Sequence, residues 1–389
     1  MTPAARVQTA ITILDEIGAG APVEKALTGW ARRSRYAGSK DRAAVRDHVF
    51  DVIRQRRSLA ALGGGESGRH LMIGLCRRTG VVPDEMFNGA PHAPVELTDA
   101  ERAGGRVPIE GSEAADLPNW LWPEFSASLG DKAAKAAEIM QTRAPVHLRV
   151  NVARTSREGA IEKLAAEGID CIAHPVASTA LEVIEGARRV HQSDAYKSGL
   201  IELQDAASQA VVESLPLEPG MRVLDYCAGG GGKALALAAH AGVDVFAHDI
   251  APQRMRDLPE RASRAKAKVT VLTPSELGNA GKFDLVLADA PCSGSGSWRR
   301  APAGKWQLTP ARLEDLLETQ LHVIETASQF AVADGAFAYA TCSSLNVENS
   351  GRVDAFLDGN SGWALKSSQA WTVLDGADGF FVALLSRVL

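Results

Sequence analysis

The stretch VLDYCAGGGGKALALAAHAG, residues 223–242, joins an apolar run to an alanine-rich segment through four consecutive glycines. The apolar run is typical of a buried strand, and the segment after the glycines is typical of a helix. Glycine adopts positive φ at little cost and lets backbone N–H groups approach a ligand at the start of the helix. The stretch therefore predicts a strand, a ligand-binding turn and a helix.

The glycine turn alone does not identify its ligand. No Ser or Thr follows Lys233, so the phosphate-loop pattern is absent, and four successive glycines satisfy several spacings of the dinucleotide fingerprint. Asp249 follows the next apolar run, about 20 residues on, where a carboxylate can accept both ribose hydroxyls. The pattern favours a nucleoside-bearing cofactor. Nicotinamide dinucleotide and S-adenosylmethionine both fit it, and a purely structural turn is the alternative.

Further apolar runs alternate with helical segments from residue 206 to residue 389. Continuous apolar strands separated by helices are typical of a sheet covered on both faces, so we expect a mainly parallel, doubly wound, Rossmann-like α/β sheet. A helix is expected after residue 308, with Thr309 as its N-cap and Pro310 in its first turn. The expected strands are 222–227, 244–249, 268–273, 284–289, 336–342 and 379–388.

Three regions precede this sheet. Apolar residues at helical spacing predict a small helical domain over residues 1–83. Residues 84–117 are acidic and rich in Pro and Gly, which favours a linker. In residues 118–205, strand-like alternation, as in VHLRVNVAR (146–154), accompanies a helical segment and predicts a small α+β module.

Composition and charge limit the class of protein. With 389 residues, 46% of them hydrophobic, and a net charge of -5, the chain is typical of a globular protein of two or three domains. No apolar run approaches the roughly 18 residues of a spanning helix, and the start lacks a signal peptide's apolar block. We expect a cytoplasmic monomer with no membrane partner. The five cysteines are widely spaced and predict neither a disulfide framework nor a metal site.

One segment is strongly basic. Residues 32–57 hold nine Lys or Arg residues against three acidic residues, Asp41, Asp47 and Asp51. Such a concentration indicates contact with phosphates, and a solvated helix face is the alternative. The basic residues are Arg32, Arg33, Arg35, Lys40, Arg42, Arg46, Arg54, Arg56 and Arg57.

Two cysteines follow expected strands. Cys292 lies in DLVLADAPCSGSGSWRR (284–300), and Cys342 lies in YATCSSLNVEN (339–349). Because the carboxyl ends of neighbouring parallel strands form the ligand crevice, both thiols are expected to face the cofactor. A buried, unreactive cysteine is the alternative, and it suits Cys76 and Cys171, which lie in no motif.

These motifs resemble those of the RNA 5-methylcytosine methyltransferases of the Fmu/Sun (NOL/NOP/Sun) type. VLDYCAGGGGK resembles the cofactor motif of that family, DAPCSGSGSWRRAPAGKWQLTP its proline-cysteine motif and YATCSSLNVEN its threonine-cysteine-serine motif. This resemblance covers about residues 118–389. DRAAVRDHVFDVIRQRRSLAAL (41–62) is similar to the NusB-like RNA-binding domain of the ribosomal-RNA branch.

The resemblance implies an S-adenosylmethionine-dependent methyltransferase domain over 206–389 and an RNA substrate, with 16S ribosomal RNA expected. It assigns Cys342 the attack on cytosine carbon 6, which makes carbon 5 nucleophilic. It gives Cys292 a role in product release and Asp289 hydrogen bonds to the base. A helix expected near Asn346, or Lys233, would favour the thiolate of Cys342. The implied cofactor residues are Cys227, Ala228, Gly229, Gly230, Gly231, Gly232, Lys233, Asp249 and Asp289.

RNA contact is expected from two polar segments, and exposed polar side chains without a ligand are the alternative. The first segment, which contains Arg149, Asn151 and Arg154, resembles a family segment linked to RNA contact. The second, which contains Arg299, Arg300 and Lys305, follows the proline-cysteine motif, and Trp306 in it could also stack on a base. The expected RNA-binding residues are Arg149, Asn151, Arg154, Arg299, Arg300 and Lys305.

The chain departs from the family pattern at the cofactor loop. Gly230 stands where proline is usual, Ala234 stands where Thr is common, and the acid expected after the third strand is missing from VTVLTPSEL (269–277). Weaker cofactor contacts would suit a non-catalytic RNA-binding assembly factor, which stays an alternative beside a transfer-RNA cytosine methyltransferase. A nicotinamide oxidoreductase would give the two thiols no role.

Overall fold

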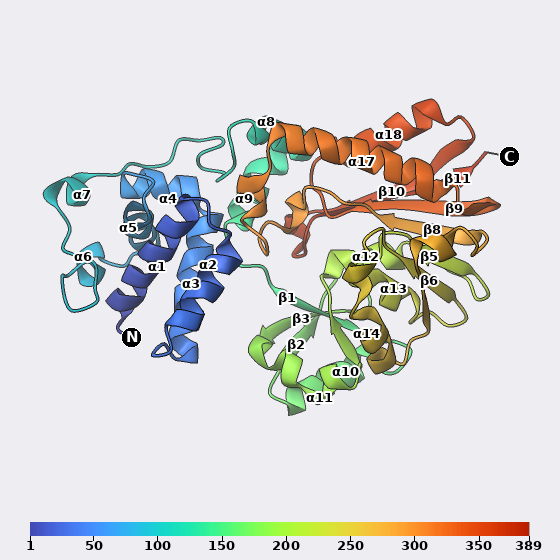
Figure 1. The fold of residues 1–389 in the computed structure, drawn as a ribbon, viewed down its shortest axis with the longest axis horizontal. Helices are drawn as coiled ribbons and strands as arrows, with labels where there is room; N and C mark the ends of the chain where they lie inside the picture. Colours follow the sequence, from blue (N-terminus) through green and yellow to red (C-terminus); the bar gives the residue numbers. More distant parts are fainter. Residues whose placement is uncertain (389) are drawn as a thin grey trace. The chain divides into compact units, whose positions relative to one another are not determined.

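The computed structural model describes residues 1–388 and divides the chain into two compact units (Figure 1). The helical unit comprises Met1–Arg143 together with Trp298–Gln307. The sheet unit comprises Ala144–Ser297 and the chain from Leu308 onward. This division differs from the expected domain boundaries, because the first unit extends beyond residue 117 and takes in a segment from the proline-cysteine motif. No helix among residues 1–388 has the length and apolar character needed to cross a membrane.

Amphipathic helices build the helical unit, as the spacing of apolar residues predicts. Thr2 caps the first helix by accepting a hydrogen bond from the backbone N–H of Ala5 at 3.2 Å. The fourth and fifth helices pack so closely that a Cβ on Gly74 would lie 2.1 Å from the carbonyl oxygen of Leu59. The helices are α1 (Pro3–Gly18), α2 (Val23–Arg33), α3 (Ser39–Arg54), α4 (Arg56–Gly63), α5 (Gly68–Thr79), α6 (Pro83–Met86), α7 (Asp99–Ala103), α8 (Leu121–Leu129), α9 (Ala133–Met140) and α16 (Gly304–Gln307).

The expected linker, residues 84–117, is held against these helices. Arg69 pairs with Glu101 at 2.6 Å, and Arg77 donates to the carbonyl of Gly104 at 2.7 Å. The buried carboxylate of Asp116 accepts hydrogen bonds from the backbone N–H groups of Arg57 and Ser58 at 2.8 and 2.9 Å. This polar segment therefore forms part of the helical unit.

A small antiparallel sheet opens the sheet unit, in agreement with the expected α+β module. Its strand order is β2-β3-β1-β4, with helix α10 (Arg157–Ala166) between β1 and β2 and helix α11 (Asp194–Lys197) before β4. The strands are β1 (Val146–Val150), β2 (Asp170–Ala173), β3 (Ala180–Glu185) and β4 (Ile201–Leu203).

The larger sheet has the order β10-β11-β9-β8-β5-β6-β7. The run from β9 to β7 is parallel, and β11 and β10 add an antiparallel edge, so the expected mainly parallel sheet is confirmed. The sequence did not predict β10, because its central residues are polar and exposed. The strands are β5 (Arg222–Asp225), β6 (Asp244–His248), β7 (Val269–Leu272), β8 (Phe283–Asp289), β9 (Ala331–Thr341), β10 (Trp363–Trp371) and β11 (Phe380–Arg387).

Helices cover both faces of the larger sheet (Figure 1). One core packs β-strand residues against α12 (Ala206–Glu213), α13 (Gly232–Leu237) and α14 (Leu258–Ala265). The other core packs them against α17 (Pro310–Ser328) and α18 (Ser350–Gly359). As predicted, Thr309 caps α17 and Pro310 lies in its first turn. The doubly wound arrangement leaves the carboxyl ends of β5, β6, β8 and β9 as one edge for a site.

Candidate active site

The two cysteine motifs meet at the ends of neighbouring strands. Strands β8 and β9 run parallel, with Asp289 opposite Ala340, so the loops that follow them leave the same edge of the sheet. The Sγ atoms of Cys292 and Cys342 lie 3.3 Å apart, and both side chains are half-buried. At this distance one thiol can donate a hydrogen bond to the other.

An ion pair between buried Lys233 and half-buried Asp289 lies in the same unit. The Nζ atom of Lys233 lies 2.7 Å from Oδ2 of Asp289 and 4.8 Å from the centre of the Phe380 ring. Burial alone lowers the pKa of Lys233, but the carboxylates of Asp289 and Asp225 outweigh it and hold that pKa above its ordinary value. Lys233 therefore keeps its positive charge, and it interacts electrostatically with Cys342.

The surroundings of the two thiols are unequal. The hydrogen bond to Cys342, together with burial and the nearby carboxylate of Glu348, raises the pKa of Cys292 well above its ordinary value. Cys292 therefore holds its proton, and in the contact between the two thiols either sulfur can be the donor. The helix expected near Asn346 begins instead at Ser350, after a turn that contains the buried residues Glu348 and Asn349. The expected helix therefore does not begin directly after Cys342, and Lys233 is the charged group that interacts with this thiol.

Glu348 joins the two cysteine loops, and the sequence analysis gave it no role. This fully buried carboxylate accepts hydrogen bonds from the backbone N–H of Ser293 at 2.7 Å, from the Ser343 hydroxyl at 2.5 Å and from Nε2 of Gln320 at 3.0 Å. The Ser293 hydroxyl also donates to it. Ser293 follows Cys292 and Ser343 follows Cys342, so one side chain fixes both loops. An acid inside a cysteine motif was the available signal, but its burial was not readable from the sequence.

Neighbouring residues fix the conformation of the glycine turn. Gly229 and Gly231 have φ values of 52° and 78°, and a Cβ on Gly231 would lie 2.3 Å from the Leu258 side chain. Buried Asp249 accepts hydrogen bonds from the backbone N–H of Gly229 at 2.9 Å and from Arg254 at 3.0 Å. The expected ribose carboxylate therefore also anchors the turn.

Two further departures from the family pattern have local structural partners. The Gly230 carbonyl, where proline is usual, accepts a hydrogen bond from Arg261. After β7, Thr273 and Glu276 cap α15 (Pro274–Leu277) reciprocally, and Glu276 accepts from the Thr273 N–H at 2.8 Å. The polar side chains of Arg261, Thr273 and Glu276 thus form hydrogen bonds with nearby backbone groups.

Asp225 is a buried carboxyl group at the end of β5. It is 1% exposed, and neither carboxylate oxygen has a hydrogen-bond partner of good geometry among residues 1–388. Burial raises its pKa to about 7, although Lys233 opposes that rise. The Ala234 backbone and Lys233 partly offset the burial of this acid, and its oxygens can still accept from a ligand with hydrogen-bond donors or positive charge. Desolvation and the nearby carboxylates raise the pKa of the neighbouring Cys227 and keep that thiol protonated.

The upstream residues expected to bind RNA have internal partners. Arg149 is 5% exposed and donates to the Gly232 carbonyl at 2.6 Å, and burial lowers its pKa to about 10. Asn151 donates to the carbonyls of Gly199 and Ala265 at 3.1 and 2.9 Å. Arg154 donates to the Arg264 carbonyl at 3.3 Å. These side chains connect the small sheet to α13 and α14.

The residues after the proline-cysteine motif also differ from expectation. Lys305 is 1% exposed and donates to the Arg54 carbonyl at 2.7 Å, and burial lowers its pKa to about 8. Trp306 donates to the Ile53 carbonyl at 2.7 Å, and buried Arg299 donates to the Arg143 carbonyl at 3.0 Å. Of the expected basic residues here, Arg300 is exposed. Arg299, Lys305 and Trp306 thus donate hydrogen bonds to backbone carbonyls of the helical unit, and the segment forms part of that unit.

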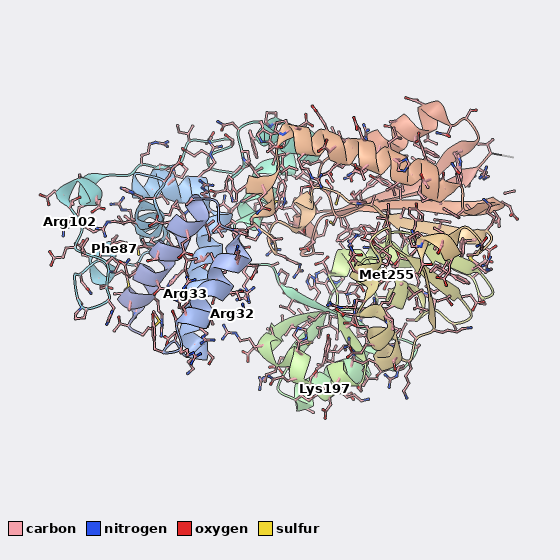
Figure 2. The ribbon with its side chains drawn as sticks, in the orientation of Figure 1. Arg32, Arg33, Phe87, Arg102, Lys197 and Met255 are labelled. Carbon is pink, nitrogen blue, oxygen red and sulfur yellow. The ribbon has the colours of Figure 1, made fainter. Side chains whose placement is uncertain are left out.

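Part of the basic segment remains at the surface of the helical unit. A hollow of about 390 Å³ is lined by Trp30 and by arginines that include Arg32 and Arg35. Figure 2 labels Arg32 on the helical unit. Arg46 in this hollow pairs with Glu24 at 3.3 Å. Arg32, Arg35 and exposed Lys40 have no hydrogen bond or ion pair among residues 1–388. These three cations are accessible to an anionic ligand.

Known proteins are similar to this chain in sequence. The family described as 16S rRNA methyltransferase RsmB/F matches residues 212–386, and the RsmF/B-like ferredoxin-like domain matches residues 117–191. Ribosomal RNA small subunit methyltransferase B of Citrobacter koseri is 32% identical over 291 residues, covering 71% of this chain and 68% of that protein. Its namesake in Xylella fastidiosa (strain 9a5c) is 30% identical over 354 residues, covering 82% of both.

A solved structure shares the fold over the full length. The crystal structure of PH0851 superposes with a TM-score of 0.76 at 21% identity, covering 100% of this chain and 99% of that one. At this identity the likeness shows the fold alone.

Proposed function

The chain belongs to the RsmB/F family of RNA methyltransferases, and we propose that it transfers a methyl group from S-adenosylmethionine to carbon 5 of a cytosine in 16S ribosomal RNA. The observation that carries this proposal is the unequal thiol pair. The pKa of Cys292 is raised, and Cys342 interacts electrostatically with Lys233, which pairs with Asp289. Two neighbouring thiols in such unequal surroundings suit a reaction that forms and then breaks a bond to the base.

The first step is addition to the base. The Cys342 thiolate forms a bond to cytosine carbon 6, and the electron pair of the C5–C6 double bond makes carbon 5 nucleophilic. Asp289 accepts a hydrogen bond from the exocyclic amine of the base, and Lys233 offsets the negative charge that develops on the ring. The ion pair at 2.7 Å keeps both groups in place before the base arrives.

The second step needs a methyl donor, and bound S-adenosylmethionine supplies an electrophilic methyl group. Gly229–Gly232 and Asp249 would hold its nucleoside part, and Asp225 would meet its amino group. The support is the positive φ of Gly229 and Gly231 in the glycine turn and the buried carboxylate of Asp225, whose oxygens have no hydrogen bond of good geometry among residues 1–388. The residues of the site thus fit this cofactor.

The last step releases the product. The proton on carbon 5 passes to the Cys292 sulfur as the proton of Cys292 passes to the departing Cys342 sulfur, and the C5–C6 double bond reforms. Cys292 ends protonated, and Cys342 ends as a thiol that must lose a proton before the next cycle. The 3.3 Å contact supports this exchange between the two sulfurs.

Ribosomal RNA is the proposed substrate, because both relatives carry the name of ribosomal RNA small subunit methyltransferase B. The accessible cations Arg32, Arg35 and Lys40 would add phosphate contacts from the helical unit. A flipped or single-stranded cytosine is required, since the ring must reach a half-buried thiol pair.

The test is bisulfite sequencing of 16S ribosomal and transfer RNA from cells with and without the gene. One cytosine in 16S RNA should lose its protection when the gene is absent. Loss of protection in transfer RNA alone would show that the substrate is transfer RNA and not 16S ribosomal RNA. Calorimetric titration with S-adenosylmethionine separates the enzyme from an RNA-binding assembly factor, because only the enzyme must bind the cofactor.

A further inference from the structure

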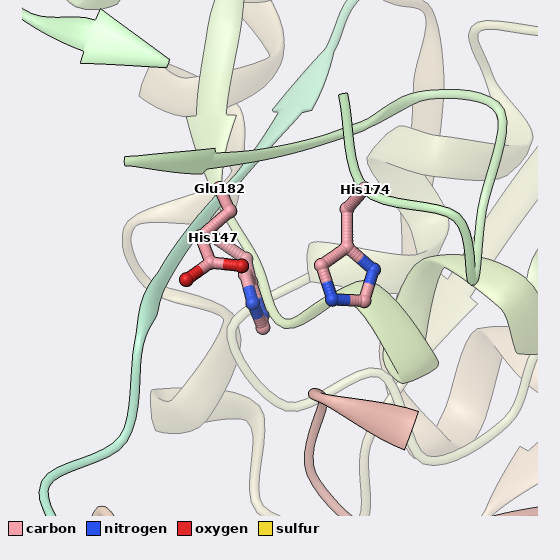
Figure 3. A group of neighbouring side chains, drawn as sticks. All are labelled: His147, His174 and Glu182. Atoms are coloured by element: carbon pink, nitrogen blue, oxygen red, sulfur yellow. The ribbon is translucent and has the colours of Figure 1, made fainter. Parts of the chain in front are cut away.

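A second group of potential ligand atoms lies in the small sheet, apart from the cysteine motifs. His147 on β1 and Glu182 on β3 are direct partners across the antiparallel pair. His174 immediately follows β2, and its backbone N–H continues the ladder to the Ala180 carbonyl at 2.9 Å. One ligand atom from each of His147, His174 and Glu182 lies within 4.8 Å of the other two (Figure 3). Three neighbouring strands thus bring two imidazoles and a carboxylate together.

His147 is oriented as metal-binding histidines are. The residue is 2% exposed, and its Nδ1 lies 2.9 Å from Oδ2 of Asp205. The backbone N–H of Ala206 also lies 3.3 Å from Nδ1. Because these two groups engage Nδ1, Nε2 is the ring nitrogen open to a metal ion. Nε2 is buried without a hydrogen-bond partner among residues 1–388.

His174 lies beside His147. It is 4% exposed, and its ring centre lies 4.7 Å from that of His147. Its Nδ1 accepts a long bond of 3.3 Å from the Val176 N–H, and the ring also contacts the Gly376 backbone. A metal ion would replace the Gly376 contact.

Glu182 can complete the set by rotating. It is half-buried, and its carboxylate makes no hydrogen bond or salt bridge among residues 1–388. Metal–ligand distances near 2.0–2.1 Å put tetrahedral donors about 3.3 Å apart, so the group must contract from its present span. A carboxylate without a competing bond makes that contraction inexpensive, and its partial exposure gives an ion a path in.

We propose that His147, His174 and Glu182 bind one transition-metal ion of the Zn²⁺ class, with a water in the fourth position. Two imidazole nitrogens and a carboxylate are the donors that Zn²⁺ takes, whereas Ca²⁺ and Mg²⁺ prefer oxygen alone. Asp205 is the outer partner that fixes the first ligand, as carboxylates do in zinc sites. The unpartnered Nε2 is the group that the ion satisfies.

The ion would act as a structural clip within the sheet unit. It would link β1, β2 and β3, and through His147 it would connect to Asp205, the N-cap of α12. Asp205 also accepts the backbone N–H of Asp378 at 3.2 Å, two residues before Phe380, which packs on Lys233. Metal binding would thus stabilise the segment beside the methyltransferase site.

The test is titration with Zn²⁺ alone, followed by calorimetry and thermal unfolding. The full-length protein should carry Cys292→Ala and Cys342→Ala, because the thiol pair is a competing zinc site. We expect one equivalent to bind and the Tm to rise. Co²⁺ should give a tetrahedral absorption spectrum without thiolate charge-transfer bands.

Variants assign the ligands. Glu182→Gln and His147→Gln should each weaken Zn²⁺ binding by at least about 100-fold, more than loss of an outer partner does. His322→Gln, an exposed histidine on α17, should leave it unchanged. Absence of binding in a folded protein, or equal affinity in Glu182→Gln and the parent, would overturn the proposal. Neither result depends on methyltransferase activity.

Discussion

The Sγ atoms of Cys292 and Cys342 lie 3.3 Å apart although 50 positions separate them in the chain. Their parallel strands end at one edge of the sheet, and Glu348 ties together the two loops that carry them. The pair is chemically unequal, because a buried carboxylate lies near Cys292 and a buried ammonium interacts with Cys342. Such unequal surroundings would suit the separate roles that we propose for the two thiols.

Cys342→Ala should lower methylation of 16S RNA by at least about 10³-fold, because no other group would form the bond to carbon 6. The measurement is transfer of labelled methyl groups from S-adenosylmethionine. Cofactor affinity and the Tm should stay near the parent values, which separates lost chemistry from lost folding. Methylation at the parent rate would remove Cys342 from the nucleophile's role.

Cys292→Ala should leave addition possible and slow release, because the proton exchange between the sulfurs is lost. A covalent protein–RNA adduct should therefore accumulate and survive a denaturing gel. The double variant with Cys342→Ala should form none. An absent adduct in the single variant, under conditions where methyl transfer occurs, would take the release role away from Cys292.

The sequence predicted the sheet and the motifs because apolar strands and glycine turns are local patterns. It did not predict which cations are free, since that depends on tertiary partners. Lys305 resembles an RNA-binding residue in the sequence, yet it is buried on the Arg54 carbonyl. Glu348 and the His147 cluster were missed for the same reason, because their ligand or hydrogen-bond partners come from distant strands and loops.

Glu348→Gln should slow product formation and shift its pH dependence. The amide keeps the shape of the side chain but removes the charge that helps to raise the pKa of Cys292, so that pKa should fall and Cys292 should ionise at lower pH. Loss of one buried acceptor should also cost about 1–3 kcal/mol of folding free energy. Adduct decay measured against pH reports the shift.

Gln320→Leu is the matched control for that variant. It removes one hydrogen bond to Glu348 and leaves the charge in place. The control should lose stability without moving the pH dependence of adduct decay. Equal shifts in both variants would mean that Glu348 acts through packing alone.

Asp225→Asn should flatten the pH dependence of folding stability. The folded-state pKa of Asp225 is about 7, above its ordinary value of 3.8, so the folded protein binds the extra proton between these values. Its contribution is fully present below about pH 4 and is lost as pH rises through about 7. Urea unfolding at several pH values should show a decline on the order of 4 kcal/mol in the parent, and a smaller decline in the Asp225→Asn variant.

The same carboxyl should make cofactor binding depend on pH. A positively charged amino group favours ionised Asp225, so S-adenosylmethionine affinity should rise as pH increases through about 7. Calorimetry with Asp225→Asn should show weaker binding and little change over that range. An unaltered pH profile in the variant would place the amino group elsewhere.

Replacing Arg32 and Arg35 together by Ala should weaken RNA binding and reduce its salt dependence. Both side chains line the hollow of the helical unit and lack internal partners among residues 1–388, so each is available to neutralise a phosphate. Each lost contact on single-stranded RNA lowers the slope of log affinity against log salt by about 0.7, which gives a change of about 1.4 for two contacts. Lys25→Ala removes an exposed charge from the same helix outside that lining and should have a much smaller effect. A double variant with the parent's salt slope would show that RNA contacts neither arginine.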